Sequence, residues 1–119
     1  MEFTTAEANT AKICGLGNGD NGQGEGDVDF GFDLMKNGKV RIRLGLALKT
    51  NPATGTKIWG TYAANDLFKV AVESARVKFY KNGTLIYSTT TAPAYPLCVD
   101  TSFFTPNATI NGAKVQQVP

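Results

Sequence analysis

The chain of 119 residues contains no histidine. Histidine is the commonest general base and a frequent metal ligand, so its absence removes the usual activator of a serine or cysteine nucleophile. A retaining glucanase needs two carboxylates about 5–5.5 Å apart. Asp27, Asp29 and Asp33 alternate along one predicted strand without a glutamate partner, and the glutamates are isolated from one another: Glu2, Glu7, Glu25 and Glu73. We therefore expect no enzymatic activity.

Long apolar runs are missing as well. None approaches the roughly 20 residues that cross a bilayer. Met1 is not followed by a signal-peptide pattern, which is typical of an intracellular chain or of a segment cut from something larger. The net charge of +2 argues neither for nor against a polyanion, and nucleic acid is not an expected partner. The length predicts a single domain over residues 1–119.

Cysteine is scarce, with only Cys14 and Cys98. A disulfide between them would close a long loop and stabilise the fold by roughly 4 kcal/mol. The alternative is a pair of buried free thiols, which behave as small hydrophobic side chains. Two cysteines alone do not establish an oxidising compartment.

The most informative stretch is residues 66–88, DLFKVAVESARVKFYKNGTLIYS. Its apolar residues alternate with polar ones, which predicts three successive strands. Asn82-Gly83 is the strongest short hairpin signal, because a type I′ turn needs positive φ at both central residues. We expect the core to contain Phe68, Val70, Val72, Val77 and Phe79, packed against Phe30, Phe32, Val40 and Ile42.

The rest of the chain also reads as short strands. Residues 2–16 suggest an edge strand, a polar link and a better strand at 10–16, and a second Asn-Gly turn at Asn37-Gly38 separates two more. Further strands are predicted at 28–35, 40–44, 58–62, 97–104 and 108–118. No stretch combines helical periodicity, caps and length. About nine strands with frequent turns predict an all-β antiparallel sandwich or barrel.

A family resemblance rests on residues 60–115, which read GTYAANDLFKVAVESARVKFYKNGTLIYSTTTAPAYPLCVDTSFFTPNATINGAKV, with ICGLGNGD and VDFGFDL before them. The order of a Tyr-x-x-x-Asp strand entry, a strand ending in Phe-Tyr-Lys-Asn-Gly, and Tyr-Pro before a closing strand resembles concanavalin A-like lectin/glucanase jelly rolls of SPRY-like pattern. It covers residues 10–118. The resemblance implies a jelly-roll sandwich and an extracellular or cell-surface location, because similar modules occur in secreted multidomain proteins.

Two features depart from that pattern. The turn at 73–76 lacks the glycine that such modules often have, and the chain has almost nothing before residue 10, where such modules have further strands. An unpaired edge at 10–16 would template strand addition from another chain. We therefore expect self-association through this strand, or a short edge strand supplied by residues 1–9.

Trp59 and Tyr62 are the first candidates for carbohydrate binding. Sugars present apolar C–H faces that stack on aromatic rings, and Asp or Asn side chains beside the rings bind the hydroxyls. The polar partners on this reading are Asn18, Asp20 and Asn21. The alternative is that each ring fills the core with its polar end at the rim.

The loop GNGDNGQGEGD at 17–27 is too rich in glycine to pack a core. Ca²⁺ takes six to eight oxygen ligands, which flexible acidic loops supply. The candidate ligands are Asp20, Glu25, Asp27 and Asp29, although their spacing matches no EF-hand and such loops are usually solvated turns.

Basic residues alternate on two strands, as Arg41 and Arg43 and as Arg76 and Lys78. In one sheet the four would form a patch for sulfated or uronic glycans or for phosphates. The alternative is the solvated face of an antiparallel sheet.

These observations favour a non-catalytic, lectin-like carbohydrate-binding module with no cofactor other than the calcium considered above. A structural or assembly subunit that uses a sheet edge for self-association or adhesion is the second interpretation.

Overall fold

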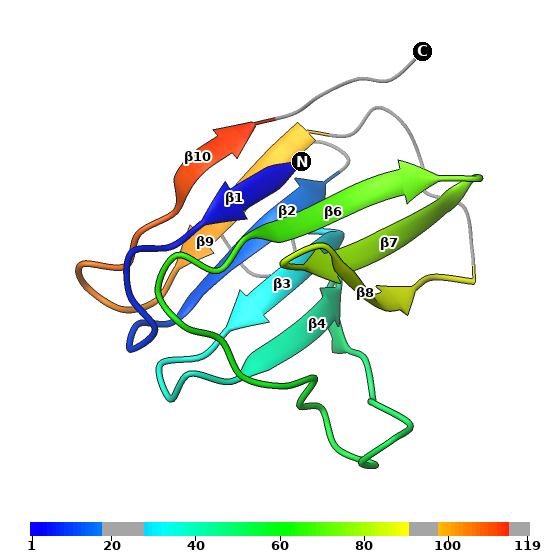
Figure 1. Ribbon diagram of the computed structural model, residues 1–119, viewed down its shortest axis with the longest axis horizontal. Coiled ribbons are helices and arrows are strands. Elements are labelled where there is room, and N and C mark those ends of the chain that lie inside the picture. Colours follow the sequence, from blue (N-terminus) through cyan, green and yellow to red (C-terminus); the bar gives the residue numbers. More distant parts are fainter. Residues whose placement is uncertain (18–27, 91–97, 115–119) are drawn as a thin grey trace.

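The computed structural model describes residues 1–17, 28–90 and 98–114. All regular elements in these ranges are strands, and they form two antiparallel five-stranded sheets packed together (Figure 1). The prediction of an all-β antiparallel sandwich is confirmed, and the arrangement is compatible with a jelly-roll type. The strands are β1 (Glu2–Thr4), β2 (Lys12–Gly17), β3 (Phe30–Leu34), β4 (Val40–Leu44), β5 (Ala47–Leu48), β6 (Phe68–Glu73), β7 (Arg76–Lys81), β8 (Thr84–Ser88), β9 (Cys98–Phe103) and β10 (Asn111–Lys114).

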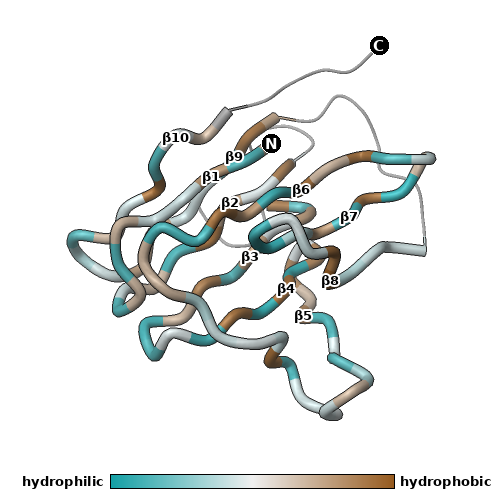
Figure 2. The backbone as a smooth tube through the Cα atoms, in the orientation of Figure 1, coloured by the Kyte–Doolittle hydropathy of each residue, from teal (hydrophilic) through white to brown (hydrophobic). Residues whose placement is uncertain are grey.

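The first sheet has the strand order β10-β1-β6-β7-β8, and the second has the order β5-β4-β3-β2-β9. Hydrophobic and hydrophilic positions alternate along several strands (Figure 2), which gives each sheet one apolar face. The two faces meet in an aromatic cluster, in which the Phe32 ring lies 4.9 Å from Phe68 and 5.3 Å from Phe79 between centroids. Phe3 stacks on Phe68 at 5.2 Å and completes this centre of the core.

The three strands predicted within residues 66–88 are confirmed as β6, β7 and β8. Their register pairs Val70 with Phe79, so that both side chains point into the core. Of the nine predicted core residues, Val72 and Phe30 are only half-buried. The others are fully buried, as predicted: Phe68, Val70, Val77, Phe79, Phe32, Val40 and Ile42.

The two Asn-Gly turns differ in type. Asn82 and Gly83 both have positive φ, at 51° and 83°, as a type I′ hairpin requires. At the other turn Gly38 has a φ of 79°, as expected, but Asn37 is not among the residues with positive φ. The amide of Gly38 donates to the Met35 carbonyl at 3.1 Å, which fits a three-residue loop with a left-handed final residue.

The predicted edge near the amino terminus is wrong. β1 lies between β10 and β6, and β2 lies between β3 and β9, so the strand at 10–16 is paired on both sides. Residues 1–9 do supply a strand, but it is an inner one. Its neighbours come from distant parts of the sequence, and local patterns carry no information about such pairings.

Two other strand predictions need adjustment. Residues 58–62 form no strand, and only Thr61 makes an isolated bridge, to Lys39. The last predicted strand shortens to β10, and residues 115–118 lie outside the described ranges. No helix in the described part of the chain is long and apolar enough to span a membrane.

Candidate functional site

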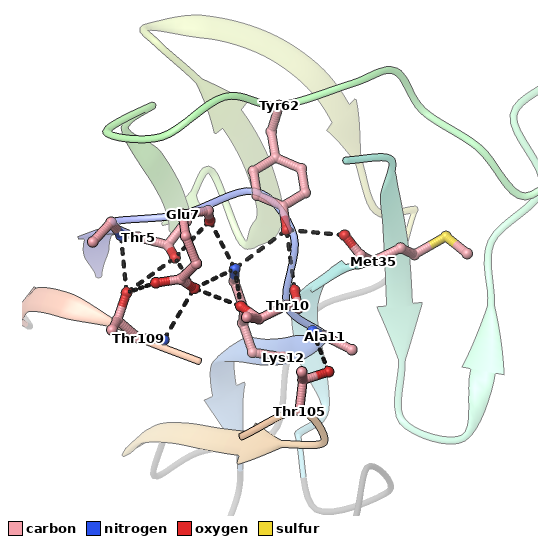
Figure 3. Close-up of polar contacts among 10 residues, drawn as sticks. Thr5, Glu7, Thr10, Ala11, Lys12, Met35, Tyr62, Thr105 and Thr109 are labelled. Carbon is pink, nitrogen blue, oxygen red and sulfur yellow. Dashed lines mark hydrogen bonds and ion pairs between the residues drawn. The ribbon is translucent and has the colours of Figure 1, made fainter. Parts of the chain in front are cut away.

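A buried polar cluster surrounds Lys12 at the start of β2 (Figure 3), and we call it the Lys12 cluster. The Lys12 side chain is 0% exposed. Its ammonium donates to the Glu7 carboxylate at 3.0 Å, to the Glu7 carbonyl at 3.0 Å and to the Thr10 hydroxyl at 2.9 Å. A fourth contact reaches the Tyr62 hydroxyl at 3.2 Å. The members of the cluster are Thr5, Glu7, Thr10, Lys12, Tyr62 and Thr109.

Glu7 is the only carboxylate of this cluster. Burial alone would raise its pKa, but hydrogen bonds from Thr10, Thr109 and Lys12 outweigh burial and lower the pKa from 4.5 to about 2. The Thr109 backbone amide adds a bond to the same carboxylate at 3.1 Å. Glu7 is therefore a charged, fully engaged acceptor that ties the segment after β1 to the segment before β10.

Tyr62 belongs to the Lys12 cluster and not to a surface site. Tyr62 is only 6% exposed. Its hydroxyl is the hydrogen-bond donor to the Met35 carbonyl at 3.0 Å and to the Thr10 carbonyl at 3.2 Å. Burial and the nearby charge of Glu7 raise its pKa to about 12. The prediction that Tyr62 stacks on a sugar is therefore wrong, because its ring packs inside the fold.

Trp59 lies instead beside Tyr87, and the two rings are 5.3 Å apart between centroids and inclined by 56°. They line a cleft of about 510 Å³ between the edge strand β8 and the segment that follows β5. The volume falls within the range of small-ligand sites. The cleft is lined by Lys49, Thr50, Pro52, Trp59, Leu85, Ile86, Tyr87 and Ser88.

Backbone contacts fix the position of the Trp59 ring. Its indole N–H donates to the Lys49 carbonyl at 3.0 Å, and its backbone amide donates to the Val40 carbonyl at 2.8 Å. Trp59 and Tyr87 are both half-buried and pack one side against the core. The cleft thus presents preset aromatic surfaces, which lose little side-chain entropy on binding.

Sequence reasoning ranked Trp59 and Tyr62 first among the aromatic candidates and placed Tyr87 below them. The sequence places Tyr87 on the return strand after the Asn82-Gly83 turn. That position does not reveal that the Tyr87 ring packs beside Trp59. The contact joins the edge strand β8 to a segment that belongs to no strand. No spacing in the sequence signals it.

Most of the predicted loop ligands lie outside the described residues. These are Asn18, Asp20 and Asn21 for a sugar, and Asp20, Glu25 and Asp27 for calcium. Asp29 is described and half-buried, and its carbonyl accepts a hydrogen bond from the Gly45 amide at 3.0 Å. Within residues 1–17, 28–90 and 98–114, no group of three His, Cys, Asp or Glu side chains could hold a metal. The calcium site stays a prediction.

The four basic residues do not share one sheet and form no common patch. Arg41 and Arg43 lie on β4 of the second sheet, whereas Arg76 and Lys78 lie on β7 of the first. Both β4 arginines bond the Asp33 carboxylate, at 3.0 Å and 2.9 Å, and Arg43 is nearly inaccessible. The alternation of charge on β4 therefore reflects an ion-pair network and not an open anion-binding face.

The two cysteines are free thiols. In the β2–β9 pairing Cys14 lies opposite Thr101 and Cys98 lies opposite Gly17, so their side chains point to opposite faces of the sheet. The disulfide alternative is therefore wrong. Cys14 is buried, as the free-thiol reading required, and burial raises its pKa to about 12, but Cys98 is exposed.

No family model, curated protein or solved structure matches the chain. The chemistry of the cleft and of the Lys12 cluster is therefore the basis for a functional assignment. The Lys12 cluster is closed and internally satisfied. The Trp59–Tyr87 cleft is open to a ligand.

Proposed function

We propose that the protein is a non-catalytic carbohydrate-binding module that acts outside the cell or at its surface. The observation that carries the proposal is the cleft with Trp59 and Tyr87 in its wall. Apolar sugar faces pack against aromatic rings, while a few polar groups orient the hydroxyls. The lining supplies such groups from Thr50, Ser88 and Lys49.

The carboxylates near the core support binding over hydrolysis. None of the described residues that line the cleft is an Asp or Glu. Glu7 has a pKa of about 2 and contacts a buried lysine, so it cannot act as the protonated general acid that glycoside hydrolysis needs. Asp33 is held by two arginines.

The sequence resemblance adds support from a different direction. The sandwich is compatible with a jelly roll, and the strand pattern of residues 60–115 resembles concanavalin A-like lectin/glucanase modules of the SPRY-like type. Because many folds host several functions, the resemblance supports the proposal but is not sufficient evidence for it.

Tryptophan fluorescence gives a direct test, because Trp59 is the only tryptophan in the chain. We expect saturable changes in its emission when the protein is titrated with members of a glycan panel. Tyr87→Leu should weaken the response. Tyr80→Leu is the matched control, since Tyr80 is also half-buried, lies on the neighbouring strand β7 and is not part of the cleft. Absence of saturable binding across the panel would contradict the proposal.

A second candidate function is assembly through a sheet edge. β9 is an outer strand of the second sheet, and Phe103 at its end and the following Phe104 are 51% and 52% exposed. Exposed edges with apolar side chains favour strand addition. Sedimentation at micromolar concentration tests this candidate. Oligomers that dissociate in the Phe104→Lys variant would support it, and a protein that stays monomeric at every concentration tested would exclude it.

A further inference from the structure

The rim of the cleft is positively charged. Lys49 is the one charged residue in the described lining, and its ammonium lies 5.8 Å from the centre of the Tyr87 ring. The Lys57 ammonium donates to the Thr50 hydroxyl at 2.7 Å, and Thr50 also lines the cleft. Two cations therefore stand at the mouth of an aromatic site.

The fold brings these two lysines together. They flank a short turn in which Asn51 and Thr56 pair as an antiparallel bridge, with the Asn51 amide 2.8 Å from the Thr56 carbonyl. The Asn51 side chain donates to the Ile58 carbonyl at 3.1 Å and anchors the end of the turn. Both lysines are exposed, and no carboxylate among the described residues pairs with either one.

From this arrangement we infer that the ligand of the cleft is an acidic glycan, whose carboxylate or sulfate groups bind Lys49 and Lys57 while its sugar ring packs against Trp59 and Tyr87. The inference rests on the proposed carbohydrate-binding function. An ammonium forms a charge-assisted hydrogen bond with a carboxylate or sulfate, which is stronger than a bond between neutral groups. A neutral sugar would leave both lysines without this partner.

Polygalacturonate oligomers and their fully methyl-esterified forms provide matched probes, because they share one backbone and differ in charge. Trp59 emission reports on both. We expect saturable binding of the acid and at least tenfold weaker binding of the ester. Binding of the acid should weaken when ionic strength rises from about 0.05 M to about 0.5 M. Dextran sulfate against dextran repeats the comparison for sulfate esters, and binding in that pair alone assigns the acid group to sulfate.

Two lysine variants distinguish binding at the cleft from non-specific electrostatic attraction of the acidic glycan to the protein. Lys49→Gln and Lys57→Gln should each weaken the binding of polygalacturonate by roughly five- to tenfold. This loss of affinity lies between that expected on removing an exposed ion pair and that expected on removing a charge-assisted hydrogen bond. Lys69→Gln is the matched control: Lys69 also lies over a tyrosine ring, at 5.3 Å from Tyr80, but outside the cleft. An equal effect of Lys69→Gln would overturn the site.

The outcomes distinguish the two proposals. If the ester binds as tightly as the acid and the lysine variants change nothing, the acidic specificity is wrong and the carbohydrate-binding function stands. Poly-glutamate carries the charge without the sugar ring. If it binds as tightly as polygalacturonate, or if no glycan changes Trp59 emission, the carbohydrate-binding function itself is wrong.

Discussion

Replacing Glu7 by glutamine removes the negative charge opposite the fully buried ammonium of Lys12. In Glu7→Gln that ammonium keeps neutral acceptors in the Thr10 hydroxyl, the Tyr62 hydroxyl and the backbone carbonyl of residue 7. It loses the one carboxylate that pairs with it among the described residues. Breaking a buried pair from one side costs about 3–5 kcal/mol. Because the Glu7 side chain is 22% exposed, we expect a value near the lower end, about 3 kcal/mol.

The assay is urea unfolding followed by circular dichroism, with calorimetry to measure Tm. For a chain of this size about 3 kcal/mol corresponds to a fall in Tm of roughly 10 °C. The double variant Glu7→Gln/Lys12→Met removes both charges and should be more stable than Glu7→Gln alone, because no uncompensated buried charge remains.

The pH dependence of unfolding gives an independent check. Glu7 has a folded pKa of about 2 against an ordinary value of 4.5, so its contribution is fully present above pH 4.5 and is lost as the pH falls towards 2. Wild type should lose stability relative to Glu7→Gln across that window. A cost of Glu7→Gln below about 0.5 kcal/mol, the usual effect of a surface substitution, would refute this reasoning. A double variant less stable than the single would refute it as well.

Three further substitutions test the core and the turns by the same unfolding assay. Phe79→Ala should cost about 3–5 kcal/mol, because the side chain is fully buried against Phe32 and Tyr87; an unchanged Tm would contradict this packing. Ala75→Gly should stabilise by about 1 kcal/mol, because Ala75 has a φ of 62° that glycine adopts without strain, and a loss of stability would count against this turn. Gly83→Val should cost about 1–3 kcal/mol at its φ of 83°, whereas Thr84→Val at the adjacent exposed position should change little; equal effects would exclude the type I′ hairpin.

Local chemistry in the sequence determined most of the strands. Alternation of apolar and polar residues identified β6 and β7 and the faces on which Val70 and Phe79 lie, because successive side chains of a strand point to opposite sides. Asn82-Gly83 identified its hairpin because few residues adopt positive φ without strain. These signals need only neighbouring residues. The absence of histidine is likewise known from the sequence alone and requires no knowledge of the fold.

Only the tertiary structure decided which strands became neighbours, and with them the chemistry of each candidate residue. Pairing of β1 with β6 and β10 converted a predicted edge into the inside of a sheet. Packing of the chain around Lys12 buried Tyr62, while packing of the segment after β5 against the edge strand β8 placed Trp59 beside Tyr87. Residues distant in sequence make these contacts. Their free energy depends on burial and on partners across the fold, and neither is encoded in the local pattern around any one residue.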